Sequence, residues 1–374
     1  MRHARAISSQ WDNRMMNDSL PAALMRREIF EQPTVLTNLV KNARATLTEV
    51  AKRAQDCQFA VLAARGSSDN ASTYGKYLLE GLAGMPTALA APSLYTLYHT
   101  SPRLKRALVI GVSQSGQSAD VVEVLQEARR QGAVTLAITN TDGSPITNAA
   151  DHVILLGVGL ERALAATKTV TAQCAAYALL ASLLVANKEL DKALGDIASY
   201  VTNVLNQEQV IASLVIDWLT AGRAAILGRG YCYGAVQETA LKLKETCYLS
   251  AEPYSAADFK HGPLAMIEAD YPVMALLNND ATLPTTLELV QQVRDRGAKV
   301  IGIASDRHAP GVSGIANLAL DNPSPNASSP TAPSPLLSTI PFIVAGQLFA
   351  MHLATRKGYN PDLSRGLSKV TVTF

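Results

Sequence analysis

Short apolar runs that end in glycine- or serine-rich turns are the feature that most limits what this chain can fold into. The run at 59–63 stops at the turn RGSS (65–68), and the run at 107–112 stops at a serine-rich turn. Apolar residues at helical spacing follow each turn. Apolar runs without alternation, separated by helices, are typical of strands covered on both faces in a parallel sheet. Strands are therefore predicted at 59–63, 107–112, 134–138 and 153–156.

The same plan occurs a second time later in the chain. The pair Arg65-Gly66 recurs as Arg229-Gly230, and the segment ARRQGA (128–133) resembles VRDRGA (293–298), each before a strand. We therefore predict an α/β protein with two domains of one type, each a parallel sheet flanked by helices in three layers. The expected parts are a flexible N-terminal segment (1–26), a first domain (27–205), a second domain (206–357) and a C-terminal tail (358–374).

Composition excludes several classes of partner. The chain has 374 residues, 48% hydrophobic, which is enough for about two domains. With 33 basic and 31 acidic side chains, a net charge of +2 and no dense Lys/Arg run, we expect neither nucleic acid nor an anionic membrane as partner. The four cysteines form no CxxC pair and the six histidines are scattered, so we expect reduced thiols and no metal or other cofactor.

Three further segments indicate where in the cell the protein is expected and which part of the chain is expected to be mobile. The polar N-terminus lacks the apolar core of a signal peptide, so we expect a cytoplasmic protein. The Ala-rich segment 170–186 is barely long enough to cross a bilayer, and a buried helix is the favoured interpretation. The segment 321–335 is too rich in Pro and Ser for a helix or an interior strand, so an exposed, mobile connection is expected.

The serine-rich turn at 113–118 is a candidate anion site. It follows a predicted strand and opens a helix, which gathers backbone N–H groups, the positive end of the helix dipole and three hydroxyls. These donors suit a sugar monophosphate, whereas no GxxxxGK[ST] or GxGxxG motif for a nucleotide occurs. A serine-rich turn that only caps a helix remains the alternative. A second such turn, at 66–68, ends the neighbouring strand and favours a binding site.

The stretch 237–267 carries the candidate chemistry. Glu238, Lys242 and Glu245 fall on one face of a predicted helix, and a loop then presents His261 before Gly-Pro. An ordinary solvated helix with i,i+4 ion pairs would give the same spacing. A carboxylate and an imidazole within one short segment instead suit acid and base catalysis.

Six motifs occur along the chain in this order: ARGSS (64–68), SQSGQSAD (113–120), AATK (165–168), ETALKLKE (238–245), KHGPLA (260–265) and GLSKVT (366–371). Together they resemble the sugar isomerase (SIS) domain family, in particular the isomerase half of glucosamine-6-phosphate synthase and the SIS-type glucosamine-6-phosphate deaminases. The resemblance covers nearly the whole chain and implies two tandem SIS domains in a homodimer with shared active sites.

The resemblance also implies roles for individual residues. Glu245 resembles the general base that moves a proton between C1 and C2, and His261 resembles the histidine that opens the sugar ring, donated by the partner subunit. Lys369 in the tail is expected to reach the reacting carbonyl or amine, Lys242 to lie near the base, and Glu238 to orient Lys242. The expected substrate-binding residues are Ser67 and Ser68 near the sugar, Ser113, Gln114, Ser115 and Ser118 at the phosphate, and Ala166, where the synthase has serine.

These implications favour a glucosamine-6-phosphate deaminase. The synthase uses an N-terminal cysteine to take nitrogen from glutamine, whereas the first cysteine here is Cys57, so free ammonia is the expected nitrogen species. A related amino-sugar or ketose phosphate isomerase, ammonia-dependent synthesis, and a SIS sensor that binds a sugar phosphate without turnover remain alternatives. The tail motif favours the deaminases.

Overall fold

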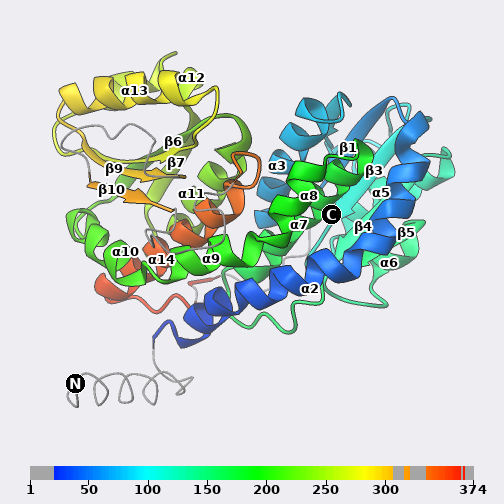
Figure 1. Ribbon diagram of the computed structural model, residues 1–374, viewed down its shortest axis with the longest axis horizontal. Coiled ribbons are helices and arrows are strands. Elements are labelled where there is room, and N and C mark those ends of the chain that lie inside the picture. The colour runs from blue at the N-terminus through cyan, green and yellow to red at the C-terminus, as the bar shows by residue number, and fades with distance from the viewer. Residues whose placement is uncertain (1–20, 306–315, 321–333, 364, 367–374) are drawn as a thin grey trace.

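The computed structural model describes residues 21–305, 316–320, 334–363 and 365–366 (Figure 1). The described part forms two α/β halves that lie side by side, with the N-terminal half blue to cyan and the C-terminal half yellow to orange (Figure 1). Most of the connection expected over 321–335 and all of the segment 1–20 lie outside the described residues.

Each half contains a five-stranded, fully parallel sheet. The order is β2-β1-β3-β4-β5 in the first and β10-β9-β8-β6-β7 in the second, which is the same order when read from the other edge. The predicted duplication and fold class are therefore confirmed. The strands of the first sheet are Phe59–Ala63 (β1), Thr87–Leu89 (β2), Ala107–Val112 (β3), Val134–Thr139 (β4) and His152–Leu155 (β5). Those of the second are Arg223–Gly228 (β6), Ser250–Ser255 (β7), Pro272–Leu277 (β8), Lys299–Ala304 (β9) and Ala316–Ala319 (β10).

Helices cover both faces of each sheet. The outer face of the first sheet packs on α5 (Ala119–Arg130) and α6 (Pro145–Ala149), and that of the second on α12 (Ala256–Phe259) and α13 (Leu283–Asp295). The inner faces share one continuous apolar core that contains residues of both halves. Its main helices are α2 (Ala23–Arg53), α3 (Ser67–Gly81), α7 (Lys168–Leu184), α11 (Tyr233–Cys247) and α14 (Thr339–Arg356). The remaining α-helices among the described residues are α4 (Ser93–Thr96), α8 (Lys188–Gly195), α9 (Ile197–Leu205) and α10 (Glu208–Leu214).

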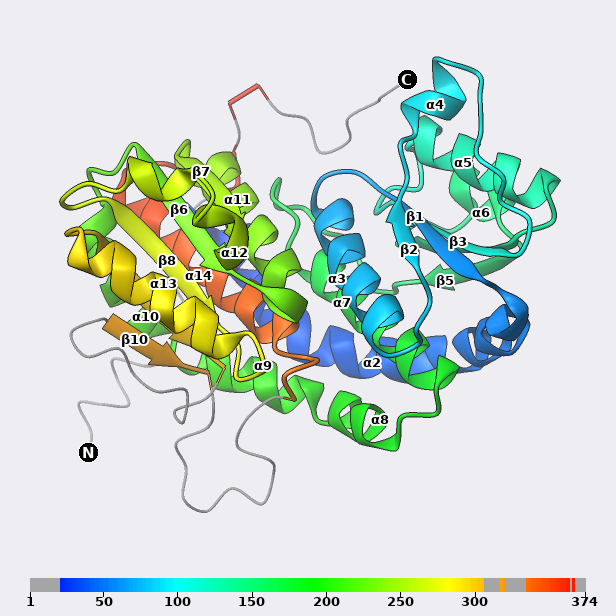
Figure 2. The ribbon, with the colours of Figure 1, turned by 90° about the horizontal axis from the view of Figure 1, so that it is seen from above.

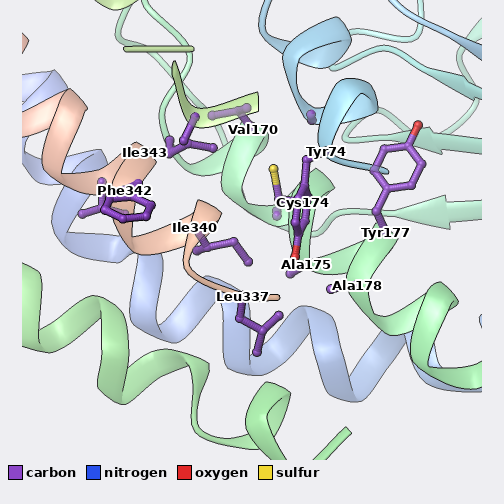
Figure 3. Close-up of a cluster of buried hydrophobic side chains, with 14 of the residues drawn as sticks. Tyr74, Val170, Cys174, Ala175, Tyr177, Ala178, Leu337, Ile340, Phe342 and Ile343 are labelled. Carbon is purple, nitrogen blue, oxygen red and sulfur yellow. The ribbon is translucent and has the colours of Figure 1, made fainter. Parts of the chain in front are cut away.

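The junction between the halves is a helical layer. α2 runs under both halves and packs along α7 and α14 (Figures 1 and 2). In Figure 3, side chains of α7 such as Cys174 lie near Ile340 and Ile343 of α14 and near Tyr74 of α3. α7 is buried almost throughout, as predicted for 170–186. No helix in the described part of the chain is long and apolar enough to span a membrane.

The structure corrects the sequence-based element assignments in three places. The predicted loop before His261 contains an edge strand, β7, whose sequence SAEPYS lacks an apolar run. The three-residue edge strand β2 was also missed. The first helix of the described residues, α2, begins at Ala23, so residues 23–26 belong to it rather than to the flexible segment expected over 1–26.

Candidate active site

The serine-rich turn links β3 to α5 at the carboxyl edge of the first sheet. Ser118 is the N-cap residue of α5, and its Oγ lies 2.9 Å from the buried Ser113 Oγ. Gly116 has φ +67°, and a Cβ there would lie 2.0 Å from Ser144 Oγ, so the turn requires glycine. The Ser115 hydroxyl accepts a hydrogen bond from the Gln117 backbone N–H at 3.3 Å. The turn therefore holds several hydroxyls at the positive end of a twelve-residue helix.

A second turn, between β1 and α3, lies beside the first. β1 and β3 are adjacent and Ala63 pairs with Gly111, so Ser67 and Ser113 leave the same edge of the sheet. Ser67 is half-buried, whereas Ser68 is buried and its Oγ accepts a hydrogen bond of 3.0 Å from Gln173 Nε2 of α7. The two turns singled out in the sequence thus come together.

The charged face of α11 points inward onto this edge. Lys242 Nζ lies 3.2 Å from Glu238 Oε1 and 2.5 Å from Glu245 Oε2. The side chains of Glu238 and Lys242 are 1% and 0% exposed, and that of Glu245 is 23% exposed. These values exclude a solvated surface helix. Glu245 is the member of the group that solvent, and hence a ligand, can reach.

α3 supplies the polar partners of this group. Ser67 Oγ donates to Glu238 Oε1 at 2.9 Å, Lys242 Nζ donates to Ser67 Oγ at 3.2 Å, and Asn70 Nδ2 donates to Glu238 Oε2 at 2.8 Å. A Cβ on Gly234 would lie 2.7 Å from the Asn70 carbonyl oxygen, so this glycine permits the close approach of α11 to α3. Sequence reasoning missed Asn70 and Gly234; the only local signal was Asn70 three residues after Ser67, one helical turn away.

Burial and charge set the protonation of the group. Burial raises the pKa of Glu238, the ammonium of Lys242 lowers it, and the Glu245 carboxylate raises it further, with a net increase above the usual glutamate value. Burial lowers the pKa of Lys242, but the two carboxylates outweigh this effect and the pKa lies above the usual lysine value. Lys242 therefore stays positively charged at neutral pH and holds a fixed charge beside Glu245.

The loop that contains Ala166 is tied to the serine-rich turn through Glu161. This buried carboxylate accepts hydrogen bonds from Gln114 Nε2 at 2.9 Å, from the Thr167 N–H at 2.9 Å and from Thr169 Oγ1 at 2.8 Å. Ala166 itself is half-buried. Glu161 was not identified from the sequence, where the only signal was an acidic residue beside Arg162 in a mostly apolar, glycine-containing stretch.

α2 fixes the same loop from the other side. Glu28 accepts hydrogen bonds from the backbone N–H groups of Arg162 and Ala163. Lys168 Nζ pairs with Glu31 Oε2 at 2.6 Å and donates to the Leu160 carbonyl at 3.0 Å. The lysine of the AATK motif is thus bound to α2, and it is 3% exposed.

Within one chain, His261 and Glu245 lie at opposite ends of the strands of the second sheet. His261 follows β7 and α12 and is exposed, beyond the carboxyl edge of the sheet where α11 also begins. Glu245 lies in the last turn of α11, roughly 18 Å further along the helix from Tyr233. One chain therefore does not bring the imidazole to its own Glu245.

Lys369 lies outside the described residues. The part of the tail before it is attached to the start of α2. Asn360 Oδ1 accepts a hydrogen bond from the Ala22 N–H at 3.1 Å, and Asp362 accepts two, from the N–H groups of Leu24 and Met25. This carboxylate compensates the positive end of the α2 dipole.

Comparison with known proteins assigns the family. The SIS domain profile matches residues 55–183 and 219–331. The glutamine–fructose-6-phosphate aminotransferase of Aquifex aeolicus is 34% identical over 354 residues, which cover 93% of this chain and 57% of that protein. The chain thus spans just over half the length of this relative. The C-terminal domain of glucosamine-fructose-6-phosphate aminotransferase from Francisella tularensis superposes with a TM-score of 0.80 at 27% identity, covering 90% of this chain and 96% of that chain.

One deaminase shares the fold. Glucosamine-6-phosphate deaminase from Thermotoga maritima superposes with a TM-score of 0.73, covering 94% of this chain and all of that chain. At 18% identity this similarity supports the fold alone. The matches to the profile in both halves and the 34% identity to a curated relative lead to one assignment: the chain belongs to the SIS domain family.

Proposed function

We propose that the protein is a glucosamine-6-phosphate deaminase that converts glucosamine 6-phosphate and water to fructose 6-phosphate and ammonia. The observation that carries this proposal is the ion-paired group of Glu238, Lys242 and Glu245, which contacts Ser67 in the turn after β1, beside the serine-rich turn. It combines a solvent-accessible carboxylate with an anion site on one edge of a sheet. Aldose–ketose proton transfer requires this combination.

The proposed reaction assigns one proton transfer to Glu245. In the open-chain sugar, its carboxylate removes the C2 proton to form an enolamine and returns a proton to C1, which leaves an imine at C2. Water adds to this imine, and ammonia leaves to give the ketose. Lys242 Nζ pairs with Glu245 Oε2 at 2.5 Å and so holds the carboxylate that acts as base in place.

Ring opening is assigned to His261 from a second copy of the chain. The exposed His261 and the Glu245 of the same chain lie at opposite ends of the strands of the second sheet, which supports a homodimer with shared sites. An equal mixture of Glu245→Gln and His261→Ala proteins should recover about one quarter of wild-type activity, because half of the dimers contain one intact site. No recovery after verified subunit exchange would contradict this arrangement.

The second candidate is a related amino-sugar or ketose phosphate isomerase, or an enzyme for ammonia-dependent synthesis of glucosamine 6-phosphate, which is the reverse reaction. It is favoured by the 34% identity to a protein named an isomerizing aminotransferase. A third candidate, a sensor that binds a sugar phosphate without turnover, has no specific support from the charged group on α11.

One assay separates these candidates. Ammonia release is measured from glucosamine 6-phosphate and galactosamine 6-phosphate, and glucosamine 6-phosphate formation is measured from fructose 6-phosphate with either ammonia or glutamine. The deaminase proposal requires ammonia release from an amino sugar phosphate. Synthesis without measurable release would favour the second candidate, and sugar phosphate binding without turnover would favour the sensor.

A further inference from the structure

Arg65 is a cation at the edge of the candidate site to which the proposed reaction gives no role. It follows β1 by two residues, just before Gly66, and its side chain is 49% exposed. Arg65 Nε donates a hydrogen bond of 2.7 Å to Asp120 Oδ2. Within the described residues, the terminal nitrogens Nη1 and Nη2 have no hydrogen-bond partner. Two pairs of N–H donors are therefore available on a guanidinium that is held in place.

Asp120 fixes this guanidinium beside the serine-rich turn. Its carboxylate is 1% exposed, lies in the first turn of α5 and accepts a hydrogen bond from the Val121 N–H at 2.9 Å. The N-cap residue of the same helix, Ser118, belongs to the serine-rich turn. Because β1 and β3 are adjacent strands, about 4.8 Å apart, Arg65 and Ser113 leave the sheet as neighbours.

We propose that Arg65 binds the phosphate group of the sugar phosphate in the serine-rich turn, and that Asp120 is the residue that positions it. The inference rests on the proposed function, because it assumes that a phosphorylated ligand occupies this turn. The serine hydroxyls and backbone amides of the turn are neutral donors, whereas a phosphate monoester carries a charge near −2. A guanidinium supplies charge and paired donors that match phosphate oxygens.

The ion pair also explains how a carboxylate is tolerated at an anion site. Without Arg65, the Asp120 carboxylate would stand in the first turn of α5 and repel a phosphate bound there. With Arg65 bound to it, the carboxylate is compensated and the remaining N–H groups stay available. Removal of Arg65 should therefore weaken phosphate binding by more than the loss of one contact.

The second half provides a matched control. Arg229 occupies the equivalent position after β6, again just before a glycine with positive φ, Gly230. Its Nη1 donates to Thr285 Oγ1 at 3.3 Å rather than to a carboxylate. Arg229→Gln changes the net charge by the same amount as Arg65→Gln, but at the other sheet.

The test is calorimetric titration of the full chain with fructose 6-phosphate at low salt. Arg65→Gln should raise Kd about 50-fold and Arg65→Lys about tenfold, because lysine keeps the charge but loses the paired donors. Arg229→Gln should leave Kd within twofold. The slope of log Kd against log salt should decrease for Arg65→Gln only. Glutamine is chosen over alanine because its amide can still donate to Asp120 and so preserve the fold.

Two results would overturn the inference: a Kd for Arg65→Gln within twofold of wild type, or equal losses for Arg65→Gln and Arg229→Gln, which would indicate a non-specific charge effect. If Arg65→Gln unfolds, Arg65→Lys decides the question by the same criterion. A wild-type protein that binds fructose 6-phosphate but releases no ammonia contradicts the proposed function while leaving this inference intact. A wild-type protein that binds no hexose phosphate overturns both.

Discussion

The turn after β3 and the turn after β8 leave equivalent strands of the two sheets, yet only the first is suited to an anion. In the first, serine hydroxyls surround the start of α5. In the second, Asp280 occupies the start of α13, where its Oδ1 accepts hydrogen bonds from the Thr282 N–H at 2.7 Å and from Thr282 Oγ1 at 2.6 Å. A carboxylate of the protein itself thus takes the position that the first half offers to a ligand.

The loop before α14 also closes the second turn. Asn278 Nδ2 donates to the Pro335 carbonyl at 3.0 Å, and Ser338 Oγ donates to Asn278 Oδ1 at 2.6 Å. Tyr74 in α3 occupies the position that Glu238 occupies in α11, counting from the glycine that precedes each helix, and its hydroxyl donates to the Leu336 carbonyl at 2.6 Å. The polar side chains around the turn after β8 thus use their hydrogen-bonding groups on other parts of the protein.

This difference shows how duplication can produce one site rather than two. Each half contributes a sheet edge and a helix that crosses to the other half. The first half keeps the serine-rich edge, and the second contributes Lys242 and Glu245 from α11. At the positions of Glu238 and Lys242, α3 has Tyr74 and Leu78, so it offers no such charged group in return. Substitutions in each half test this division.

The largest effect should come from Glu245, the carboxylate proposed as the base. Glu245→Gln should lower kcat about 1,000-fold, because the amide cannot accept the C2 proton, while Kd for fructose 6-phosphate changes less than about tenfold. The control is Glu80→Gln on α3, which removes a carboxylate with an i,i+4 lysine partner, Lys76, and should leave kcat unchanged. Comparable losses of kcat and affinity in Glu245→Gln would mean that this carboxylate is structural.

The second prediction exchanges residues between the turn after β8, which its own side chains fill, and the serine-rich turn after β3. Ser115 is the counterpart of Asp280, so Ser115→Asp should raise Kd for fructose 6-phosphate about 100-fold through like-charge repulsion. Asp280→Ser should create no second site, because Asn278 and Ser338 still hold the loop closed. Calorimetry gives both affinity and stoichiometry. A stoichiometry of two ligands per chain in Asp280→Ser would show that the carboxylate alone blocks the second turn.

Sequence reasoning succeeded where the structure depends on local pattern. The strands β1, β3 and β4 are apolar runs that are buried almost throughout, so composition alone identifies them. β5 is an edge strand in which only Ile154 is buried, and its run of Val, Ile and Leu identifies it. β7 was missed because an edge strand is paired on one side only and tolerates Pro253 and Glu252. The grouping of Glu238, Lys242 and Glu245 followed from helical spacing, but spacing did not say which way this face points.

The direction of that face depends on contacts between distant segments. Asn70 and Ser67 bind Glu238 across the junction of the two halves, and Gly234 permits the approach. No local pattern encodes such a pairing. Likewise, Glu161 joins Gln114 to its own loop only after the sheet has brought the ends of β3 and β5 to one edge.

The third prediction concerns the hydrogen bond between Glu161 and Gln114. Glu161→Gln should raise KM about tenfold and lower the melting temperature, because an amide offers one acceptor oxygen to donors that the carboxylate now binds with two. kcat should fall less than threefold, since Glu245 is unaffected. Steady-state kinetics and a thermal melt give both values. A lower melting temperature with unchanged KM would show that Glu161 supports the fold without positioning Gln114.

The smallest effect concerns the glycine that each half places at a helix crossing. A Cβ on Gly346 of α14 would lie 2.3 Å from Thr239 Oγ1 of α11, and one on Gly75 of α3 would lie 2.6 Å from the Tyr177 ring of α7. Either substitution to alanine should lower the free energy of unfolding by about 2 kcal/mol.

The two halves should differ in whether this loss can be repaired. Thr239→Ala removes the clashing hydroxyl, so Gly346→Ala with Thr239→Ala should regain more than about half of the loss. Tyr177→Phe leaves the ring that clashes with Gly75→Ala and also removes the hydroxyl that lies 2.9 Å from Ser72 Oγ, so that double variant should regain nothing. Urea unfolding of the four single and two double variants measures this. If both double variants regained the same share of the lost stability, the prediction would be wrong. The helices would then relieve the clash by shifting, since rigid helices could do so only where the clashing atoms are removed.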